Sequence, residues 1–320
     1  MRTTDLARTT ARTYEVRHRT RYTYSDDVSS SYGRAYLVPR SAPGQTCLAS
    51  RLDVEPAAAA TSESVDFYGN RSVYFEVHTR HRVLDVLAVS TVEVARSVPD
   101  LGSLDDRSWE QGVREVAAST LQAGGSGGSG AGGAGGAVDV EARDMLLESP
   151  QVGRGGDAAA YAAGVFVPGR PLGEALGALV STIHRDFTYR SGSTSVSTTL
   201  DEVLRKREGV CQDFAHLAVA CLRGIGLPAR YVSGYLETEP PPGKAKLQGA
   251  DASHAWVSVL VPDLGWVDLD PTNDQAADSR YVVTAWGRDY TDVPPLKGVI
   301  FTEATKSTLK VEVDVVRVDG

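Results

Sequence analysis

Three residues of this chain have the side chains that acyl-transfer chemistry needs, and each lies in a short segment that suits a reactive group. Cys211 follows Gly-Val and precedes Gln-Asp-Phe, His254 lies in Ser-His-Ala-Trp, and Asp270 lies in Asp-Leu-Asp-Pro-Thr. A thiolate nucleophile, an imidazole base and a carboxylate that orients the base act together on several unrelated folds. The three residues therefore predict a cysteine-dependent amidase or acyltransferase.

The segment after Cys211 has the apolar spacing of a helix with one buried face. The apolar positions are Phe214, Leu217, Ala218, Cys221, Leu222 and Ile225. Extended backwards, this stripe reaches Cys211, so we expect the sulfur in the first turn, with Gly209 or Val210 at the N-cap. There the unpaired N–H groups and the positive end of the helix dipole favour a thiolate. The helix should end near residues 224–228, and Cys221 should be an inert core thiol.

The histidine and the aspartate belong to a predicted β-hairpin formed by His254–Val261 and Trp266–Asp270, with a turn signal at Pro262–Gly265. Side chains alternate between the faces of a strand, so the two share a face only if the aspartate lies opposite an even-numbered residue such as Trp256. A tight four-residue turn would place it opposite Val257 instead. We therefore expect a bulge or an odd-numbered loop at the turn.

Each of the three residues also has an ordinary structural explanation. A cysteine at a helix start can be a buried apolar residue, a histidine at a strand end can be a satisfied polar group, and aspartate before Pro-Thr often starts a turn. A zinc site of Cys211, His216 and His254 is a rival, but no CxxC or HxxxH pair supplies close ligand spacing. The presence of all three residue types favours catalysis over a non-catalytic binding module.

Around these residues the sequence resembles the bacterial transglutaminase-like superfamily. The resembling segments are Phe187-Thr188-Tyr189, Thr194, Gly209 to His216, Leu227 to Tyr235, Ser253 to Trp256 and Gly265 to Asn273. The resemblance extends to the amino-terminal region typical of this family, in Tyr14 to Tyr24, Pro39-Arg40 and Tyr68-Gly69-Asn70.

The resemblance implies a fold and three roles. It implies Cys211 as nucleophile, His254 as base and Asp270 as orienting residue. The expected fold class is α+β, a papain-like transglutaminase core with the nucleophile helix packed on an antiparallel sheet, preceded by a β-rich domain. The reaction stays open, because the superfamily includes transglutaminases, peptidases, amidases and members without catalysis.

Two side chains could complete an oxyanion hole beside the Cys211 amide, which would otherwise be the lone donor. Gln212 and Tyr189 both carry a side-chain donor, and such holes combine a backbone N–H with a side-chain group. Transglutaminases use a tryptophan upstream of the cysteine for this purpose. None lies between Trp109 and Cys211 here.

Three further residues are candidates for supporting the substrate or the oxyanion. Asp213 and His216 lie on the nucleophile helix and could either support the site or bind backbone and salt-bridge partners. Trp256 is the third, although both it and Trp266 are expected to pack beneath the hairpin.

Without a tryptophan pair to shield the thioester from water, we expect hydrolysis of a peptide or other amide to exceed transamidation.

Composition restricts the partners. The chain of 320 residues has 33 Lys and Arg against 41 Asp and Glu, a formal charge of −8, which argues against nucleic acid. No window approaches the length of a membrane span, and the first thirty residues lack an apolar signal core. Three widely spaced cysteines suit a reducing compartment, so we expect a cytoplasmic protein. The predicted partner is a peptide or protein substrate, with no cofactor and no metal; the oligomeric state stays open.

Four regions are expected along the chain. Residues 1–100 are predicted to be a β-rich, β-sandwich-like domain, and residues 101–165 a helical and Gly-rich linker with a flexible tract at 124–136. Residues 166–295 form the predicted catalytic core, in which Leu172–Asp186 is a helix and Thr199 opens a capping box. Residues 296–320 follow the catalytic core, and alternation over 308–318 predicts a strand that returns to a sheet.

Overall fold

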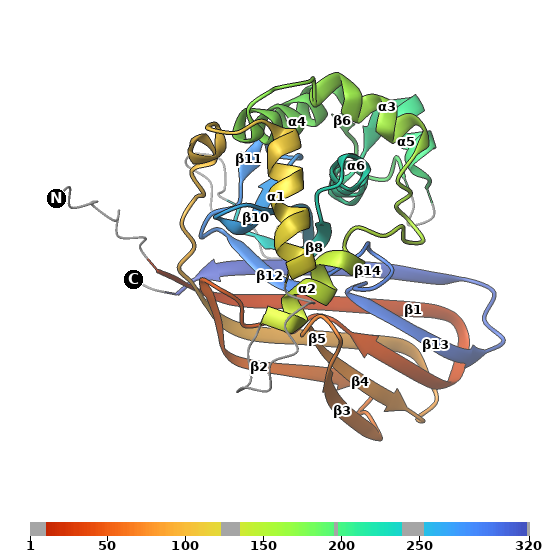
Figure 1. Ribbon diagram of the computed structural model, residues 1–320. Coiled ribbons are helices and arrows are strands. Elements are labelled where there is room, and N and C mark those ends of the chain that lie inside the picture. Colours follow the sequence, from red (N-terminus) through yellow and green to blue (C-terminus); the bar gives the residue numbers. More distant parts are fainter. Residues whose placement is uncertain (1–10, 123–134, 195–197, 239–252, 319–320) are drawn as a thin grey trace, which may run out of the picture.

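The computed structural model describes residues 11–122, 135–194, 198–238 and 253–318, with a helical layer above a central sheet and a second, larger sheet below (Figure 1). The larger sheet contains β1 (Arg12–Ala35), β2 (Gln45–Glu55), β3 (Ala60–Val65), β4 (Arg71–Val77), β5 (His81–Val94), β13 (Leu296–Thr302) and β14 (Ser307–Arg317).

Strand β1 organises this amino-terminal domain. Its first half pairs with β5 and β14, and its second half pairs with β4 and β13. The register shifts between Thr23 and Val28, and side chains from both halves meet in one apolar interior, where Phe75 of β4 joins Val86 of β5. The β-rich amino-terminal region predicted from the alternating sequence is confirmed.

The central sheet has the order β11-β10-β9-β8-β12. Its strands are β8 (Ala229–Leu236), β9 (Ser253–Val261), β10 (Gly265–Asp270), β11 (Gln275–Ala276) and β12 (Tyr281–Gly287), and all its pairings are antiparallel. The helices are η1 (Leu101–Leu104), α1 (Trp109–Gln122), α2 (Gly135–Asp144), α3 (Gly156–Val165), α4 (Leu172–Asp186), α5 (Leu200–Lys206) and α6 (Cys211–Ile225).

Helix α6 packs on β8 and β9 and is surrounded by α3, α4 and α5 (Figure 1). Two short strands, β6 (Thr188–Tyr189) and β7 (Glu208–Gly209), pair in parallel beside its start. The chain is therefore of the α+β class, with a helix packed on an antiparallel sheet, as predicted. None of the described helices is both long and apolar enough to cross a membrane.

The segment at 101–165 is more than a connection. Leu104, Val116 and Ala162 from this segment lie in the same apolar cluster as residues of α4 and α6. Burial of these side chains joins η1, α1 and α3 to the core. The Gly-rich tract falls mostly on residues 123–134, which lie outside the described part of the chain.

The carboxyl-terminal segment returns to the first strand. Strand β14 pairs with β1 in an unbroken antiparallel register from Tyr14 opposite Arg317 to Tyr24 opposite Ser307. On the face toward the central sheet, Tyr14 and Val16 pack with Tyr235 of β8. The two β layers thus share a buried interface to which both ends of the described chain contribute.

Candidate active site

Helix α6 begins at the predicted nucleophile, Cys211. Val210 is the N-cap residue with an extended backbone, and its N–H donates to the Asp213 carboxylate at 2.8 Å. The same carboxylate accepts the Thr194 hydroxyl at 2.7 Å. A Cβ atom on Gly209 would come within 2.9 Å of an Asp213 oxygen, so glycine suits the approach to the helix. These contacts hold the half-buried Cys211 in the first turn, as predicted.

The far end of α6 also follows the prediction. Gly226 caps the helix with φ +98°, a left-handed conformation that glycine adopts without strain. Cys221 is completely buried, with its sulfur 3.7 Å from the Ala158 carbonyl oxygen. Burial raises the pKa of the Cys221 thiol to about 12, so it stays protonated at neutral pH. Its packing role is that of an inert core thiol.

The hairpin of β9 and β10 has the odd-numbered loop that the catalytic hypothesis requires. Three residues, 262–264, join the strands. The register places Leu269 opposite Val257, so the next residue, Asp270, falls on the same face as His254. The expected loop geometry is confirmed.

The three predicted catalytic side chains meet in space. His254 Nε2 lies 2.7 Å from Asp270 Oδ2. The side chains of His254 and Cys211 are within hydrogen-bonding reach, and because Nε2 is engaged by the carboxylate, Nδ1 is the ring nitrogen left for the sulfur. A helix start and two neighbouring strands thus place a thiol, an imidazole and a carboxylate in series.

Two residues that sequence analysis did not identify hold the carboxylate. The Tyr281 hydroxyl and the Asn273 side-chain amide each donate to Asp270 Oδ2 at 2.7 Å. Asn273 belongs to the Asp-Pro-Thr-Asn motif and could have been proposed on that basis. Tyr281 comes from β12, two strands away from His254 in the sheet, and carries no local sequence signal.

The electrostatics favour a charged histidine beside the cysteine. Burial lowers the pKa of His254, but hydrogen bonds and charges from Asp270 and Cys211 outweigh it and raise that pKa to about 10. Burial also raises the pKa of Asp270, yet hydrogen bonds from His254, Asn273 and Tyr281 hold it below the usual value. An imidazolium therefore lies between an ionised carboxylate and the sulfur at neutral pH.

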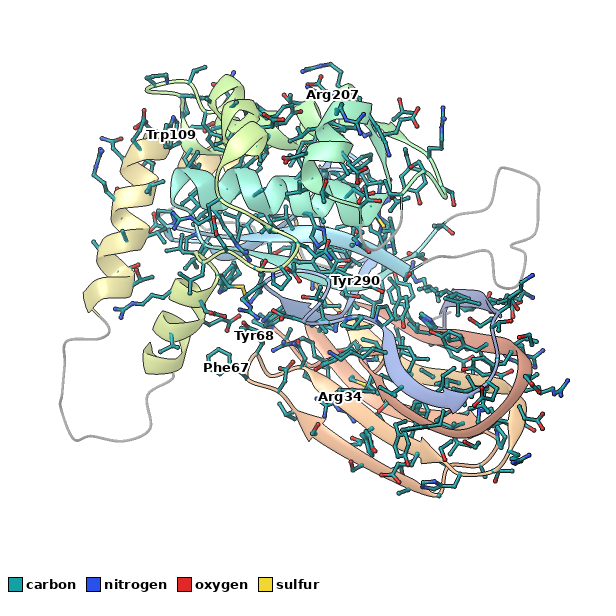
Figure 2. All side chains as sticks on the ribbon, turned by 90° about the vertical axis from the view of Figure 1, so that its right-hand side faces the viewer. Arg34, Phe67, Tyr68, Trp109, Arg207 and Tyr290 are labelled. Carbon is teal, nitrogen blue, oxygen red and sulfur yellow. The ribbon has the colours of Figure 1, made fainter. Side chains whose placement is uncertain are left out.

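Cys211 and His254 open into a cleft of about 330 Å³ between the central sheet and the amino-terminal sheet. The residues that line it are His18, Thr20, Tyr22, Tyr189, Val210, Cys211, Gln212, Tyr231, Ser233, Ser253, His254, Ala255, Tyr290, Pro295, Leu296, Leu309 and Val311. Figure 2 labels Tyr290 at the junction of the two layers. The amino-terminal domain therefore supplies one wall of the cleft.

The two candidate oxyanion donors both face this cleft. Gln212 follows the nucleophile directly, and Tyr189 of β6 is half exposed beside it. Burial and the nearby charge of Cys211 raise the pKa of Tyr189, so its hydroxyl remains a donor. Both residues stay candidates for the oxyanion hole.

The other three predicted supporting residues lie outside the cleft lining. Asp213, in the first turn of α6, caps the helix by accepting the Val210 N–H. His216 Nε2 accepts the Tyr290 N–H at 3.1 Å, and burial lowers the pKa of His216 to about 4, so the ring is neutral. Trp256 is completely buried, with its ring 5.2 Å from that of Tyr281. Trp256 thus packs behind the site, in keeping with the expectation that it lies beneath the hairpin.

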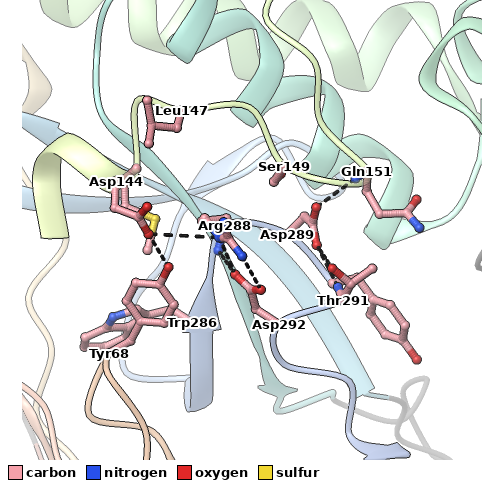
Figure 3. A network of polar contacts seen from close by, with 12 residues as sticks. Tyr68, Asp144, Leu147, Ser149, Gln151, Trp286, Arg288, Asp289, Thr291 and Asp292 are labelled. Atoms are coloured by element: carbon pink, nitrogen blue, oxygen red, sulfur yellow. Dashed lines mark hydrogen bonds and ion pairs between the residues drawn. The ribbon is translucent and has the colours of Figure 1, made fainter.

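The turn that carries Tyr290 is held by polar contacts (Figure 3). Asp289 accepts the Gln151 N–H at 2.8 Å and the Thr291 hydroxyl at 2.6 Å. Arg288 pairs with Asp292 at 3.0 Å. Together with His216, these contacts fix the position of Tyr290, which lines the same cleft as Cys211.

The residues proposed as rival zinc ligands have other partners. His254 Nε2 is bound to Asp270, and His216 Nε2 is bound to the Tyr290 amide. Within the described ranges, no group of three His, Cys, Asp or Glu side chains is arranged to hold a metal ion.

Comparison with known proteins identifies two matching family models. Residues 14–93 match the bacterial transglutaminase-like N-terminal region, and residues 159–271 match the transglutaminase-like superfamily. The fold resembles that of a Cytophaga hutchinsonii protein described as a candidate cysteine protease. That structure has a TM-score of 0.73 and 20% sequence identity over 97% of this chain and 92% of the other.

Two similar sequences cover nearly all of this chain, and a third covers part of it. An uncharacterized Mycobacterium tuberculosis protein is 48% identical over 96% of this chain and 93% of its own length. An uncharacterized Mycobacterium leprae protein is 31% identical over 94% and 98%, respectively. A protein-glutamine gamma-glutamyltransferase of Pseudomonas aeruginosa is 34% identical over 98 residues, which are 30% of this chain and 15% of that protein.

Proposed function

The chain belongs to the transglutaminase-like superfamily, and we propose that it is a cysteine-dependent amide hydrolase, a peptidase or amidase acting through a thioester on Cys211. The observation that supports the proposal is His254, hydrogen-bonded to Asp270 and within reach of Cys211, at the mouth of a cleft. The substrate is a peptide or protein that supplies the acyl group.

The proposed reaction has two halves. The Cys211 thiolate attacks the amide carbon, and the Cys211 N–H with Gln212 or Tyr189 binds the resulting oxyanion. The His254 imidazolium gives its proton to the leaving amine as the C–N bond breaks, which leaves a thioester. Neutral His254 then takes a proton from water, whose oxygen attacks the thioester; the C–S bond breaks, the acid is released, and the Cys211 thiolate and His254 imidazolium are restored.

Water is the proposed acceptor because no tryptophan pair shields the thioester from water. No tryptophan is among the described lining residues of the cleft, and Trp256 is buried behind the site. The similarity to the gamma-glutamyltransferase supports a second candidate, transfer of the acyl group to an amine. The two candidates share the thioester and differ only in the second half of the reaction.

The experiment that distinguishes hydrolysis from acyl transfer to an amine measures the masses of the products. The protein is incubated with a peptide amide in the presence and absence of a lysine-like amine, and the products are identified by mass spectrometry. We expect the free acid to dominate in both conditions. Predominant amine incorporation would favour the transferase and leave the three site residues in place.

A non-catalytic binding module would keep the fold without the chemistry. Iodoacetamide at neutral pH distinguishes it, because a thiolate beside an imidazolium is alkylated faster than an ordinary thiol. We expect stoichiometric alkylation of Cys211. We also propose a reducing, cytoplasmic setting, which would keep this thiol reduced.

A further inference from the structure

The wall of the cleft opposite the nucleophile is apolar and accessible. It includes Tyr22 of β1 with Leu309 and Val311 of β14. Leu309 and Val311 keep 56% and 45% of their surface exposed. Two accessible aliphatic side chains in the cleft that holds the catalytic cysteine provide a place for apolar groups of a substrate.

This cleft also lacks charged partners outside the catalytic residues. No Asp, Glu, Lys or Arg is among its described lining residues. The one further histidine, His18, binds the Tyr235 hydroxyl at 3.0 Å and the Thr20 hydroxyl at 3.1 Å. Burial lowers the pKa of His18 to about 4, so its ring is neutral at neutral pH. A charged substrate side chain would lose its hydration here without gaining an ion pair.

The backbone beside this wall has an edge to which a peptide can add. Strand β14 pairs with β1 on one side, and within the described residues no strand pairs with its other side. The side chains from Ser307 to Val311 are all exposed. An edge strand presents unpaired N–H and C=O groups, and an extended peptide can bind by continuing the sheet.

We propose that the acyl donor is an extended peptide segment that adds to the edge of β14 at Ser307–Val311. Its uncharged, apolar side chains next to the reactive amide contact Leu309 and Val311. This inference rests on the proposed function, since it names the substrate class of the same site. The cleft volume of about 330 Å³ suits side chains of a segment rather than a folded domain.

The first test uses peptide electrophiles that carry apolar or acidic residues beside the reactive group. Their labelling rate is divided by the iodoacetamide rate of the same protein. In Leu309→Glu we expect this ratio for the apolar peptide to fall about ten- to hundredfold. The matched control is Val299→Glu on β13, which is 62% exposed but outside the cleft lining, and it should keep the wild-type ratio. Circular dichroism verifies that both variants fold.

The second test scans the apolar peptide with single N-methyl groups, each of which removes one backbone donor. Addition to a strand edge predicts that methylation weakens labelling at alternate residues. A ratio unchanged in Leu309→Glu, or labelling insensitive to every N-methyl group, would overturn this inference even if iodoacetamide reacts with Cys211. Failure of both reagents with wild-type Cys211 would instead reject the proposed function.

Discussion

Asp270 is fixed before a substrate arrives. Its buried carboxylate accepts hydrogen bonds from His254, Tyr281 and Asn273, and the Thr272 N–H donates to its second oxygen at 2.8 Å. Such a carboxylate orients the imidazole and stabilises its positive charge. At the residue scale, Asp270 therefore holds the His254 ring in one orientation beside the half-buried Cys211 thiol.

Replacement of Asp270 separates orientation from charge. In Asp270→Asn an oxygen can still accept from His254 Nε2, so we expect a loss in kcat/KM of about tenfold, whereas Asp270→Ala should lose about a thousandfold. The measurement is hydrolysis of a peptide amide by the two variants and the wild-type protein. Equal activity in all three would mean that Asp270 only starts a turn.

The raised pKa of His254 gives a prediction for the alkaline side of the pH profile. The imidazolium protonates the leaving amine, so activity should fall as pH rises through about 10, where His254 loses its proton. The same proton stabilises the fold below the usual histidine pKa of about 6.5, and that contribution is lost as pH rises through about 10. Rates of peptide-amide hydrolysis against pH test the first statement.

The Asp270→Asn variant is the control for this profile. Asp270 contributes both a hydrogen bond and a negative charge to the raised pKa of His254. We expect the alkaline limb of Asp270→Asn to move toward lower pH. An alkaline limb that stays in place would assign the titration to another group.

At the scale of elements, the start of α6 determines where the sulfur lies. Valine has no polar side chain, so Val210 cannot cap the helix N–H groups itself. Asp213 supplies the reciprocal contact by accepting the Val210 N–H. The capping residue thus lies two positions beyond the nucleophile.

We predict that Asp213→Ala lowers the free energy of unfolding by about 1–2 kcal/mol and slows Cys211 labelling, because the first turn loses its cap. Asp213→Asn keeps an acceptor oxygen and should lose less of both. Urea unfolding and labelling rates of the two variants are the measurements. An alanine variant as stable as the wild-type protein would show that the turn is held by other contacts.

Local sequence patterns were sufficient for these elements. The apolar stripe predicted α6 and the position of Cys211, and alternation combined with shared chemistry predicted an odd loop in the hairpin. The same reasoning could not place Tyr281, because its position depends on packing across the sheet. For Asp213 and His216 the sequence could not decide between support of the site and a structural role. Their backbone partners are Val210, at the helix cap, and Tyr290, from a distant segment.

At the scale of the whole molecule, two side-chain amides join the layers. Strand β12 is an edge of the central sheet, and Gln45 both accepts the Val283 N–H and donates to the Val283 oxygen, each at 2.8 Å. Asn70 does the same at Trp286, at 2.9 and 2.7 Å. The amides bind the edge of β12 as a neighbouring strand would, and so hold the amino-terminal wall of the cleft beside Cys211.

We expect Gln45→Ala and Asn70→Ala each to lower the free energy of unfolding by about 1–3 kcal/mol, since buried backbone groups lose their partners. The loss of a fixed wall should also raise KM for peptide substrates. Thr46→Ala, an exposed neighbour on β2, is the control. Unchanged stability in both amide variants would contradict this account of the interface.

This interface was beyond the reach of the sequence. Gln45 and Val283 are 238 positions apart, and no periodic pattern links them. The alternating residues at 308–318 predicted a strand that returns to a sheet, and β14 pairs along the first half of β1. The sequence also could not show that β1 and β14 line the cleft at Cys211, because this depends on how the two layers pack.

The most direct test of the account is identification of the residue that a peptide electrophile modifies. The chain contains two internal controls, because burial raises the pKa of both the Cys47 and the Cys221 thiols. Mass spectrometry of the digested protein should find one adduct, on Cys211, which disappears in a folded Cys211→Ala variant. An adduct on Cys47, or labelling and turnover that persist in Cys211→Ala, would contradict the assignment of Cys211 as the nucleophile.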